Sequence, residues 1–361
     1  MSTPSCLSRR AVLGWLAAAN CSVLAATQPA AKSAKKPART GATKGAAKHA
    51  VNGAPRGVAG GTAVMDRINA ATATPVLARG ARNDAVLRAQ VLLDRAWFSP
   101  GEIDGSFGTN MRRMLVAYQT STGLPPSGRV DAATWKSLMG DFPDPVLEQY
   151  TLTKEDAAGP FAKTPRDMME RALLKSLPYE SIEEALGERF HCSPGWLKSV
   201  NRGVAFEPGD RIVVPALGKE TPPTKAASIR IDKSERVLYL LDTAEMPVAA
   251  FPISIGGSSD PLPLGRMEIK NAAKNPVFTY DPELLKNADK SQAKTDIRPG
   301  PNNPVGVYWL GLSKPHWGIH GTPEPSRVGT AETNGCIHMT NWDVTRLARV
   351  VKAGFVVDVH A

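Results

Sequence analysis

The stretches WGIHGT (residues 317–322) and TNGCIHMTNWD (residues 333–343) place a histidine, His320, ahead of a cysteine, Cys336. A thiol attacks a carbonyl only as the thiolate, and an unassisted cysteine, with a pKa of ~8.5, is mostly protonated near neutral pH. An imidazole within hydrogen-bond reach can take that proton and later return it to a leaving amine. Gly335 permits a tight turn, so that backbone N–H groups can point at a developing oxyanion. The pattern predicts Cys336 as a nucleophile, His320 as its base and Gly335 in the same site.

Chemistry alone leaves two alternatives open for these residues. Cys336 could be a buried apolar side chain and His320 a hydrogen-bonded histidine of the core. His320, Cys336 and His338 could instead hold zinc with an open position, because residues i and i+2 of a strand share a face. The sequence offers no fourth ligand, and we predict neither a metal nor another cofactor.

The C-terminal part of the chain has the pattern of a β-rich domain. Two apolar runs, 228–232 and 236–241, flank three turn residues and predict a hairpin. One helix is predicted over 343–352, with Thr340 or Asn341 as its cap. The further strand candidates are 248–255, 306–312 and 354–359.

The two motifs resemble the active-site signature of the L,D-transpeptidase (YkuD) family, and their His-to-Cys spacing agrees with that of the family. The resemblance covers residues 227–361 and includes the loop GPNNPVG (300–306). It implies a mostly β, sandwich-like catalytic domain in which Cys336 is the nucleophile and His320 the general base. It also implies peptidoglycan stem peptides as the substrate class. The neighbouring motif positions that we expect to contact the substrate are Gly321, Thr322, Thr333, Asn334 and His338.

Two positions depart from the family pattern. The family usually has His or Arg where Asn334 stands, and Arg where His338 stands. Asn334 can form hydrogen bonds but cannot titrate, and His338 cannot reproduce a permanently charged guanidinium with five donors. We expect these departures to affect substrate preference more than nucleophilicity.

Residues 79–141 are predicted to form a small three-helix domain. Apolar residues recur at helical spacing after the capping residues Asn83 and Asp131, and glycines mark the turns. The runs DGSFG (104–108) and GRVD (128–131) resemble the peptidoglycan-binding type 1 domain. The resemblance implies that this domain binds the cell-wall polymer.

Residues 177–217 are predicted to form a second small module. Ser181 and Glu184 fit a capping box, a helix starts at Ser193, and residues 211–215 form a strand. The order of these elements is similar to a LysM module, a class that binds glycans containing N-acetylglucosamine. Residues 142–176 are expected to be a connector, and residues 218–226 a linker. The fold class is therefore multidomain α+β.

The start of the chain predicts export. Two arginines precede an uncharged stretch within residues 1–26, which resembles a secretory signal of the ordinary or the twin-arginine kind. Residues 27–78 are rich in Ala, Lys, Gly, Pro and Thr, and are expected to form a disordered basic linker. Removal of the signal would leave two cysteines, Cys192 and Cys336, for which pairing in a disulfide is an alternative to two free thiols.

The net charge of +10 does not indicate a nucleic-acid binder. Residues 1–65 hold nine basic and no acidic side chains, and the remaining chain holds 35 basic and 34 acidic ones. Nucleic-acid binding needs basic residues clustered on a folded face. The folded part is nearly neutral, which argues against a nucleic-acid partner.

These predictions converge on an exported, wall-associated periplasmic L,D-transpeptidase with no membrane span after signal cleavage. The expected partners are peptidoglycan stem peptides and glycan, with a second stem, a D-amino acid or a wall-linked protein as the amine acceptor. One alternative is hydrolysis of the same thioester, as in an L,D-carboxypeptidase or endopeptidase. Another is a wall-anchoring protein without catalytic activity.

Overall fold

The structure is a computed structural model that describes residues 59–143, 145–258, 260–285 and 288–361. The expected export signal (1–26) and most of the expected linker lie outside these residues. Within the described ranges no helix is long and apolar enough to cross a membrane.

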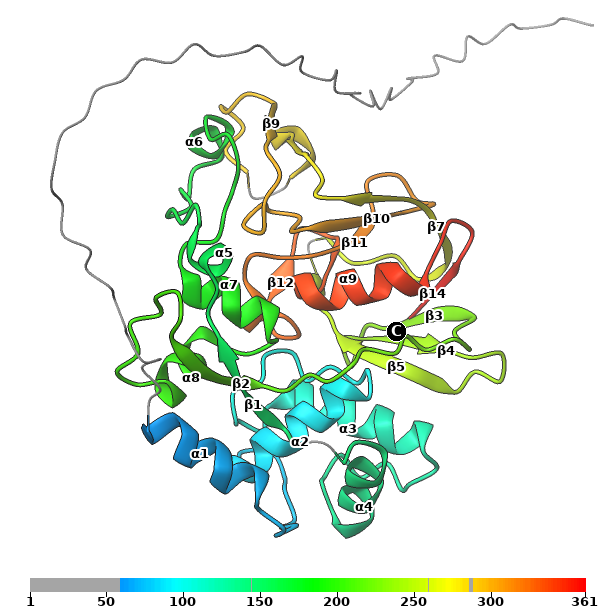
Figure 1. The fold of residues 1–361 in the computed structure, drawn as a ribbon. Helices are drawn as coiled ribbons and strands as arrows, with labels where there is room; N and C mark the ends of the chain where they lie inside the picture. The colour runs from blue at the N-terminus through cyan, green and yellow to red at the C-terminus, as the bar shows by residue number, and fades with distance from the viewer. Residues whose placement is uncertain (1–58, 144, 259, 286–287) are drawn as a thin grey trace, which may run out of the picture. The chain divides into compact units, whose positions relative to one another are not determined.

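The C-terminal region, residues 227–361, contains one eight-stranded mixed sheet, in the order β13-β11-β10-β7-β14-β3-β4-β5. The predicted hairpin is confirmed, since β3 pairs antiparallel with β4. Helix α9 (Asn341–Val350) confirms the predicted helix, and its apolar residues join the core cluster of the sheet. The mostly β domain with one packed helix is thus observed (Figure 1). Its strands are β3 (Ser228–Asp232), β4 (Val237–Leu241), β5 (Pro247–Pro252), β7 (Gly265–Lys274), β10 (Tyr308–Leu312), β11 (Gly318–His320), β13 (Ile337–His338) and β14 (Val356–His360).

Shorter elements surround the large sheet. Strands β6 (Ile255–Gly256) and β12 (Glu332–Thr333) pair in parallel, and β8 (Phe278–Tyr280) pairs antiparallel with β9 (Thr295–Ile297). Two 3₁₀ turns, η1 (Pro282–Leu284) and η2 (Pro325–Arg327), lie in the connections.

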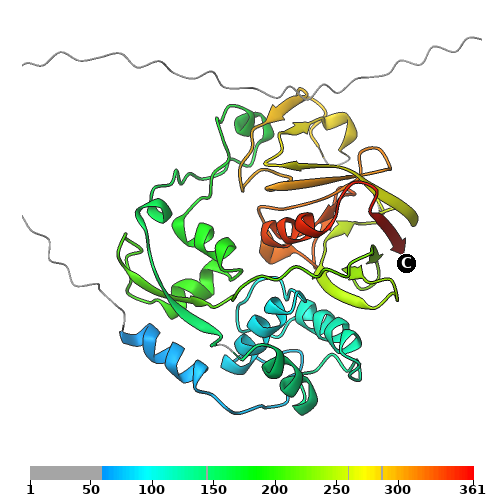
Figure 2. The ribbon, with the colours of Figure 1, turned by 45° about the vertical axis from the view of Figure 1, so that its right-hand side comes forward.

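The three predicted helices of the N-terminal module are α2 (Asp84–Arg95), α3 (Thr109–Ser121) and α4 (Ala132–Asp141). The side chain of Asn83 accepts a hydrogen bond from the N–H of Val86, and that of Asp131 accepts one from Thr134. These bonds pair backbone N–H groups of the first helical turn, which have no acceptor within the helix. Figure 2 shows the module beside β5, where the backbone of Ala250 bonds to residues 97 and 99.

The prediction of a disordered linker over residues 27–78 is wrong for its C-terminal part, which contains a helix. Residues 59–69 form helix α1 (Ala59–Asn69), with Val64, Met65 and Ile68 at the i, i+1, i+4 spacing of one helix face. Ile68 is 1% exposed in the core, with Val64 and Met65 packed against it. Three apolar residues, together with the hydrogen bonds of Asn69 to the backbone of Val146 and Leu147, dock this helix.

The expectation of a connector over residues 142–176 also needs correction. This segment supplies β1 (Leu147–Thr151), which pairs antiparallel with β2 (Arg211–Pro215), and two short helices, α5 (Lys154–Ala157) and α6 (Met168–Ala172). Between β1 and β2 lie the two predicted helices, α7 (Ile182–Arg189) and α8 (Pro194–Val200). The first strand of the module lies upstream of residue 177, because the register places Leu147 opposite Pro215.

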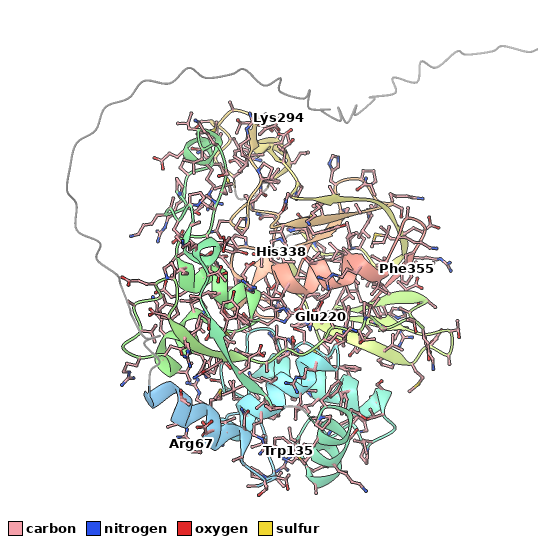
Figure 3. All side chains as sticks on the ribbon, viewed as in Figure 1. Arg67, Trp135, Glu220, Lys294, His338 and Phe355 are labelled. Atoms are coloured by element: carbon pink, nitrogen blue, oxygen red, sulfur yellow. The ribbon has the colours of Figure 1, made fainter. Side chains whose placement is uncertain are left out.

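A buried ionic cluster joins these modules. Arg346 of α9 donates two hydrogen bonds of 2.9 Å to the carboxylate of Asp94 in α2, and a third to Glu220 in the linker. His191, which follows α7, lies 3.1 Å from the same carboxylate. Glu220, labelled in Figure 3, lies between α9 and the three-helix module. The cluster joins the C-terminal module to the three-helix module through largely buried opposite charges.

Candidate active site

Cys336 lies in the turn between β12 and β13, directly after Gly335. Gly335 has a φ of +108°, a region that favours glycine. A Cβ at this position would lie 2.9 Å from Oδ2 of Asp260 and 3.3 Å from the Trp317 ring. The hydroxyl of Thr333 donates a 2.7 Å hydrogen bond to the carbonyl of Cys336 and closes the turn. Both glycine and threonine therefore shape the loop that presents the thiol.

The thiol of Cys336 is protonated in the resting site. Burial raises its pKa to about 11, and the nearby charge of Asp260 adds to the rise while a backbone N–H at Gly318 opposes it. The S–H donates to the carbonyl of His316 at 3.5 Å. A nucleophilic role for this thiol would therefore require a base to take its proton.

His320 ends strand β11 and is only 2% exposed. Its Nδ1 lies 2.7 Å from the carbonyl oxygen of Gly321, so Nδ1 carries the proton and Nε2 keeps its lone pair. The indole of Trp309 stacks on the imidazole, with ring centroids 5.3 Å apart. Burial lowers the pKa of His320 to about 4, against a smaller opposing effect of the Gly321 bond. His320 is thus a neutral imidazole in the tautomer that can accept a proton.

His338 lies beside His320 because β11 and β13 pair in parallel. Their register sets His320 opposite His338, and the two ring centroids are 4.3 Å apart. Burial, followed by the neighbouring His320, lowers the pKa of His338 well below its ordinary value. Figure 3 shows His338 near the N-terminal end of α9. Among the described residues, no group of three or more His, Cys, Asp or Glu side chains is arranged to hold a metal ion.

Cys336 and His320 line one cavity of about 940 Å³. Most of the predicted site residues meet there, namely Thr333, Asn334, Gly335 and His338 beside Cys336 and His320. Gly321 and Thr322 lie outside the lining. Gly321 orients His320 through its carbonyl, and the hydroxyl of Thr322 accepts the N–H of Glu324.

Several lining residues were not predicted from the sequence. Two of them are the aromatic residues Trp309 and Trp317. Trp317 could have been found from the sequence, because it belongs to the histidine motif. The β8–β9 hairpin and Met168 could not, since their place in the cavity depends on contacts between distant segments. Among the described residues that line the cavity, three are acidic, namely Asp260, Asp281 and Glu332, and none is Lys or Arg.

Replacing Gly335 with alanine tests whether the turn presents the thiol. The added Cβ must adopt a strained φ and meets Asp260 and Trp317, so we expect Cys336 to shift and its acylation rate to fall roughly a hundredfold. Gly354→Ala is the matched control, because Gly354 has a φ of +86° with no atom within 4 Å of an added Cβ. Thermal unfolding should show that both variants are folded, with the smaller loss of stability in Gly354→Ala. Equal acylation rates in the two variants would contradict the role of the turn.

Comparison with known proteins agrees with this geometry. The L,D-transpeptidase catalytic domain of the YkuD type matches residues 226–359, and a peptidoglycan binding domain matches residues 82–138. A protein of Bacillus licheniformis, provisionally named L,D-transpeptidase YkuD, is 33% identical over 180 residues, covering 49% of this chain and 92% of that protein. The protein of the same name from Bacillus subtilis is 32% identical over 146 residues, covering 40% and 72% of the two chains.

A solved structure, that of the L,D-transpeptidase from Xylanimonas cellulosilytica, is 13% identical and covers 80% of this chain and 100% of that chain, with a TM-score of 0.35. The assignment therefore rests on the sequence matches and not on this superposition. By those matches, the chain belongs to the YkuD family of L,D-transpeptidases.

Proposed function

We propose that this chain cleaves peptidoglycan tetrapeptide stems with Cys336 and transfers the acyl group to an amine. The observation that carries the proposal is that the turn-presented thiol and a neutral His320, whose Nδ1 is held by Gly321, line the same cavity. Such a pair supplies a nucleophile and a base of the correct tautomer. The family membership supports acyl transfer as the reaction class.

In the proposed first half-reaction, Nε2 of His320 takes the proton from the Cys336 thiol as Sγ attacks the carbonyl of the third stem residue. Backbone N–H groups at Gly335 and Cys336 are suited to hold the tetrahedral oxyanion. The C–N bond to the terminal D-Ala then breaks, and the imidazolium gives its proton to the leaving amine. A thioester on Cys336 and free D-Ala result.

In the second half-reaction an amine attacks the thioester. His320 takes a proton from the attacking amine, the C–S bond breaks, and the imidazolium passes that proton to the departing Sγ. A second stem as acceptor gives a 3–3 cross-link, whereas a D-amino acid or a wall-linked protein gives an exchanged or anchored product. The Cys336 thiol and the His320 imidazole are both neutral at rest. The proton therefore moves to His320 during the attack and not before it.

The accessory modules are proposed to hold the enzyme on its polymer in the periplasm, after export. The matched peptidoglycan binding domain supports association with the cell wall. Attachment at a second point on the same polymer raises the effective concentration of stems at the catalytic site without new contacts there. We place no nucleic acid among the partners.

The test is incubation of the full chain with purified tetrapeptide muropeptides, followed by mass spectrometry. We expect a 3–3 cross-linked dimer and free D-Ala, and an exchanged product when a D-amino acid is added. Tripeptide as the only product, whether or not an amine is present, would replace transfer by hydrolysis. Binding to sacculi without any product would replace catalysis by anchoring.

A further inference from the structure

Asn341, the first residue of α9, packs against Gly321, the residue that follows His320. Its side chain is 2% exposed, and its Oδ1 accepts a 3.1 Å hydrogen bond from the N–H of Val307. A Cβ added to Gly306 or to Gly321 would overlap this oxygen. The Asn341 amide therefore rests against Gly321, the residue whose carbonyl holds Nδ1 of His320.

The other end of the Asn341 amide is held by a different module. Its Nδ2 donates a 2.7 Å hydrogen bond to Oε1 of Glu188 in helix α7, and a longer one of 3.2 Å to the carbonyl of Pro301. The second oxygen of Glu188 accepts the hydroxyl of Tyr179 at 3.2 Å. Both oxygens of Glu188 are thus used by donors, and one donor belongs to the residue that supports the catalytic loop.

We propose that Glu188 is a positioning residue for His320, acting through Asn341 and Gly321. The inference rests on the proposed function, since it concerns the base of that reaction. A catalytic imidazole must be held close to its productive geometry, and misplacement by about 1 Å can reduce a rate roughly a hundredfold. Glu188 anchors the amide that determines where the Gly321 carbonyl lies, so a side chain outside the catalytic domain sets the orientation of its base.

The surroundings of Glu188 are unfavourable for an acidic side chain, which indicates a role beyond packing. Burial raises its pKa to about 8, and the carboxyls of Glu184 and Glu102 raise it further, while the bonds from Asn341 and Tyr179 oppose the rise. A buried acid among other acids destabilises the folded chain unless its bonds compensate. The hydrogen bond to Asn341 is one such compensation, and it also determines the orientation of the amide.

The test compares variants of the full chain in acylation by the carbapenem imipenem, followed by intact mass. Glu188→Ala removes the hydrogen bond to Asn341. Glu188→Asp keeps a buried carboxyl group but moves it away from Asn341 by the length of one methylene. We expect the maximal acylation rate to fall at least about tenfold in both, with little change in the imipenem concentration for half-maximal rate. Glu188→Gln has the same shape and keeps an oxygen for Asn341, so it should stay within about threefold of the parent chain.

Glu184→Ala is the matched control, because Glu184 lies one turn away on α7 and its carboxylate accepts the N–H of Glu180. It should leave the acylation rate unchanged. An equal loss in Glu184→Ala and Glu188→Ala would assign the effect to helix α7 in general and overturn the proposal. A parent-like rate in Glu188→Ala would overturn it as well, and Glu188→Asp gives the same decision where the alanine variant folds poorly.

A second measurement separates this inference from the proposed function. The side-chain ¹⁵N resonances of His320 report its tautomer without any reaction. We expect the Nδ1–H form to dominate in the parent chain and to lose population in Glu188→Ala but not in Glu184→Ala. A parent chain that forms no adduct yet shows this tautomer change would defeat the proposed reaction and leave the positioning role standing. An unchanged tautomer in an active parent and its Glu188→Ala variant would defeat the positioning role alone.

Discussion

Replacing Cys336 with alanine is expected to abolish adduct formation with a carbapenem, the inhibitor class that the family resemblance implies, and to stop release of D-Ala from tetrapeptide stems. The variant has no atom that can form the thioester, so the loss should be roughly 10⁴-fold or more, the scale seen when a catalytic nucleophile is removed. Intact mass reports the adduct, and chromatography of muropeptides reports the products. The fold should be preserved, because a smaller side chain at a turn introduces no clash.

Cys192→Ala is the control for this result, since Cys192 is the other described cysteine and is free like Cys336. Cys192 is 1% exposed, and burial raises the pKa of its thiol far above the ordinary range. An inert thiol of this kind should not react, so Cys192→Ala should form adduct at the parent rate. An adduct that persists in Cys336→Ala and disappears in Cys192→Ala would reassign the nucleophile.

The largest stability effect is expected at Asp94. Its carboxylate is fully buried and holds the guanidinium of Arg346, which is itself 2% exposed. Changing Asp94 to asparagine leaves that cation with Glu220 at 2.6 Å and with Asp343 at 3.9 Å, and breaking a buried pair in this way costs about 3–5 kcal/mol. We expect the midpoint of urea unfolding to fall accordingly, because the cluster joins α2 to the catalytic helix α9.

Asp84→Asn is the matched control on the same helix. Asp84 pairs with Arg67, labelled in Figure 3, but the two side chains are 47% and 61% exposed. A pair of this kind contributes at most about 1 kcal/mol. Similar midpoints for Asp84→Asn and Asp94→Asn would show that the buried cluster does not hold the modules together.

The difference between the parent chain and Asp94→Asn should depend on pH. Burial alone would raise the pKa of Asp94, but the charges of Arg346 and His191 together lower it below the ordinary value. A carboxyl with a lowered pKa stabilises the fold above its unfolded pKa of ~3.9, and this contribution is lost as the pH falls below that value. The gap between the two urea midpoints should therefore be largest near neutral pH and narrow below about pH 4.

Much of the catalytic region could be predicted because its signals are local. The hairpin of β3 and β4 follows from alternating apolar residues around a turn, and helix α9 follows from its cap and its apolar face. Strand β7 was not predicted, although it is central in the sheet between β10 and β14. Beyond Met267 and Ile269 its residues are mostly polar and exposed, so its place depends on the strands on either side.

The sequence by itself predicted Cys336 and His320 as a pair, because two short motifs carry a thiol, an imidazole and the glycine before the thiol in the pattern of a known family signature. It also predicted a three-helix module ahead of the catalytic domain, through its caps and turn residues, and a peptidoglycan binding domain matches that segment. Only the tertiary structure decided what surrounds the pair. The parallel register that sets His338 against His320 and the support of Asn341 by Glu188 join segments far apart in the chain. Such contacts depend on how whole elements pack, and no local pattern of residues encodes them.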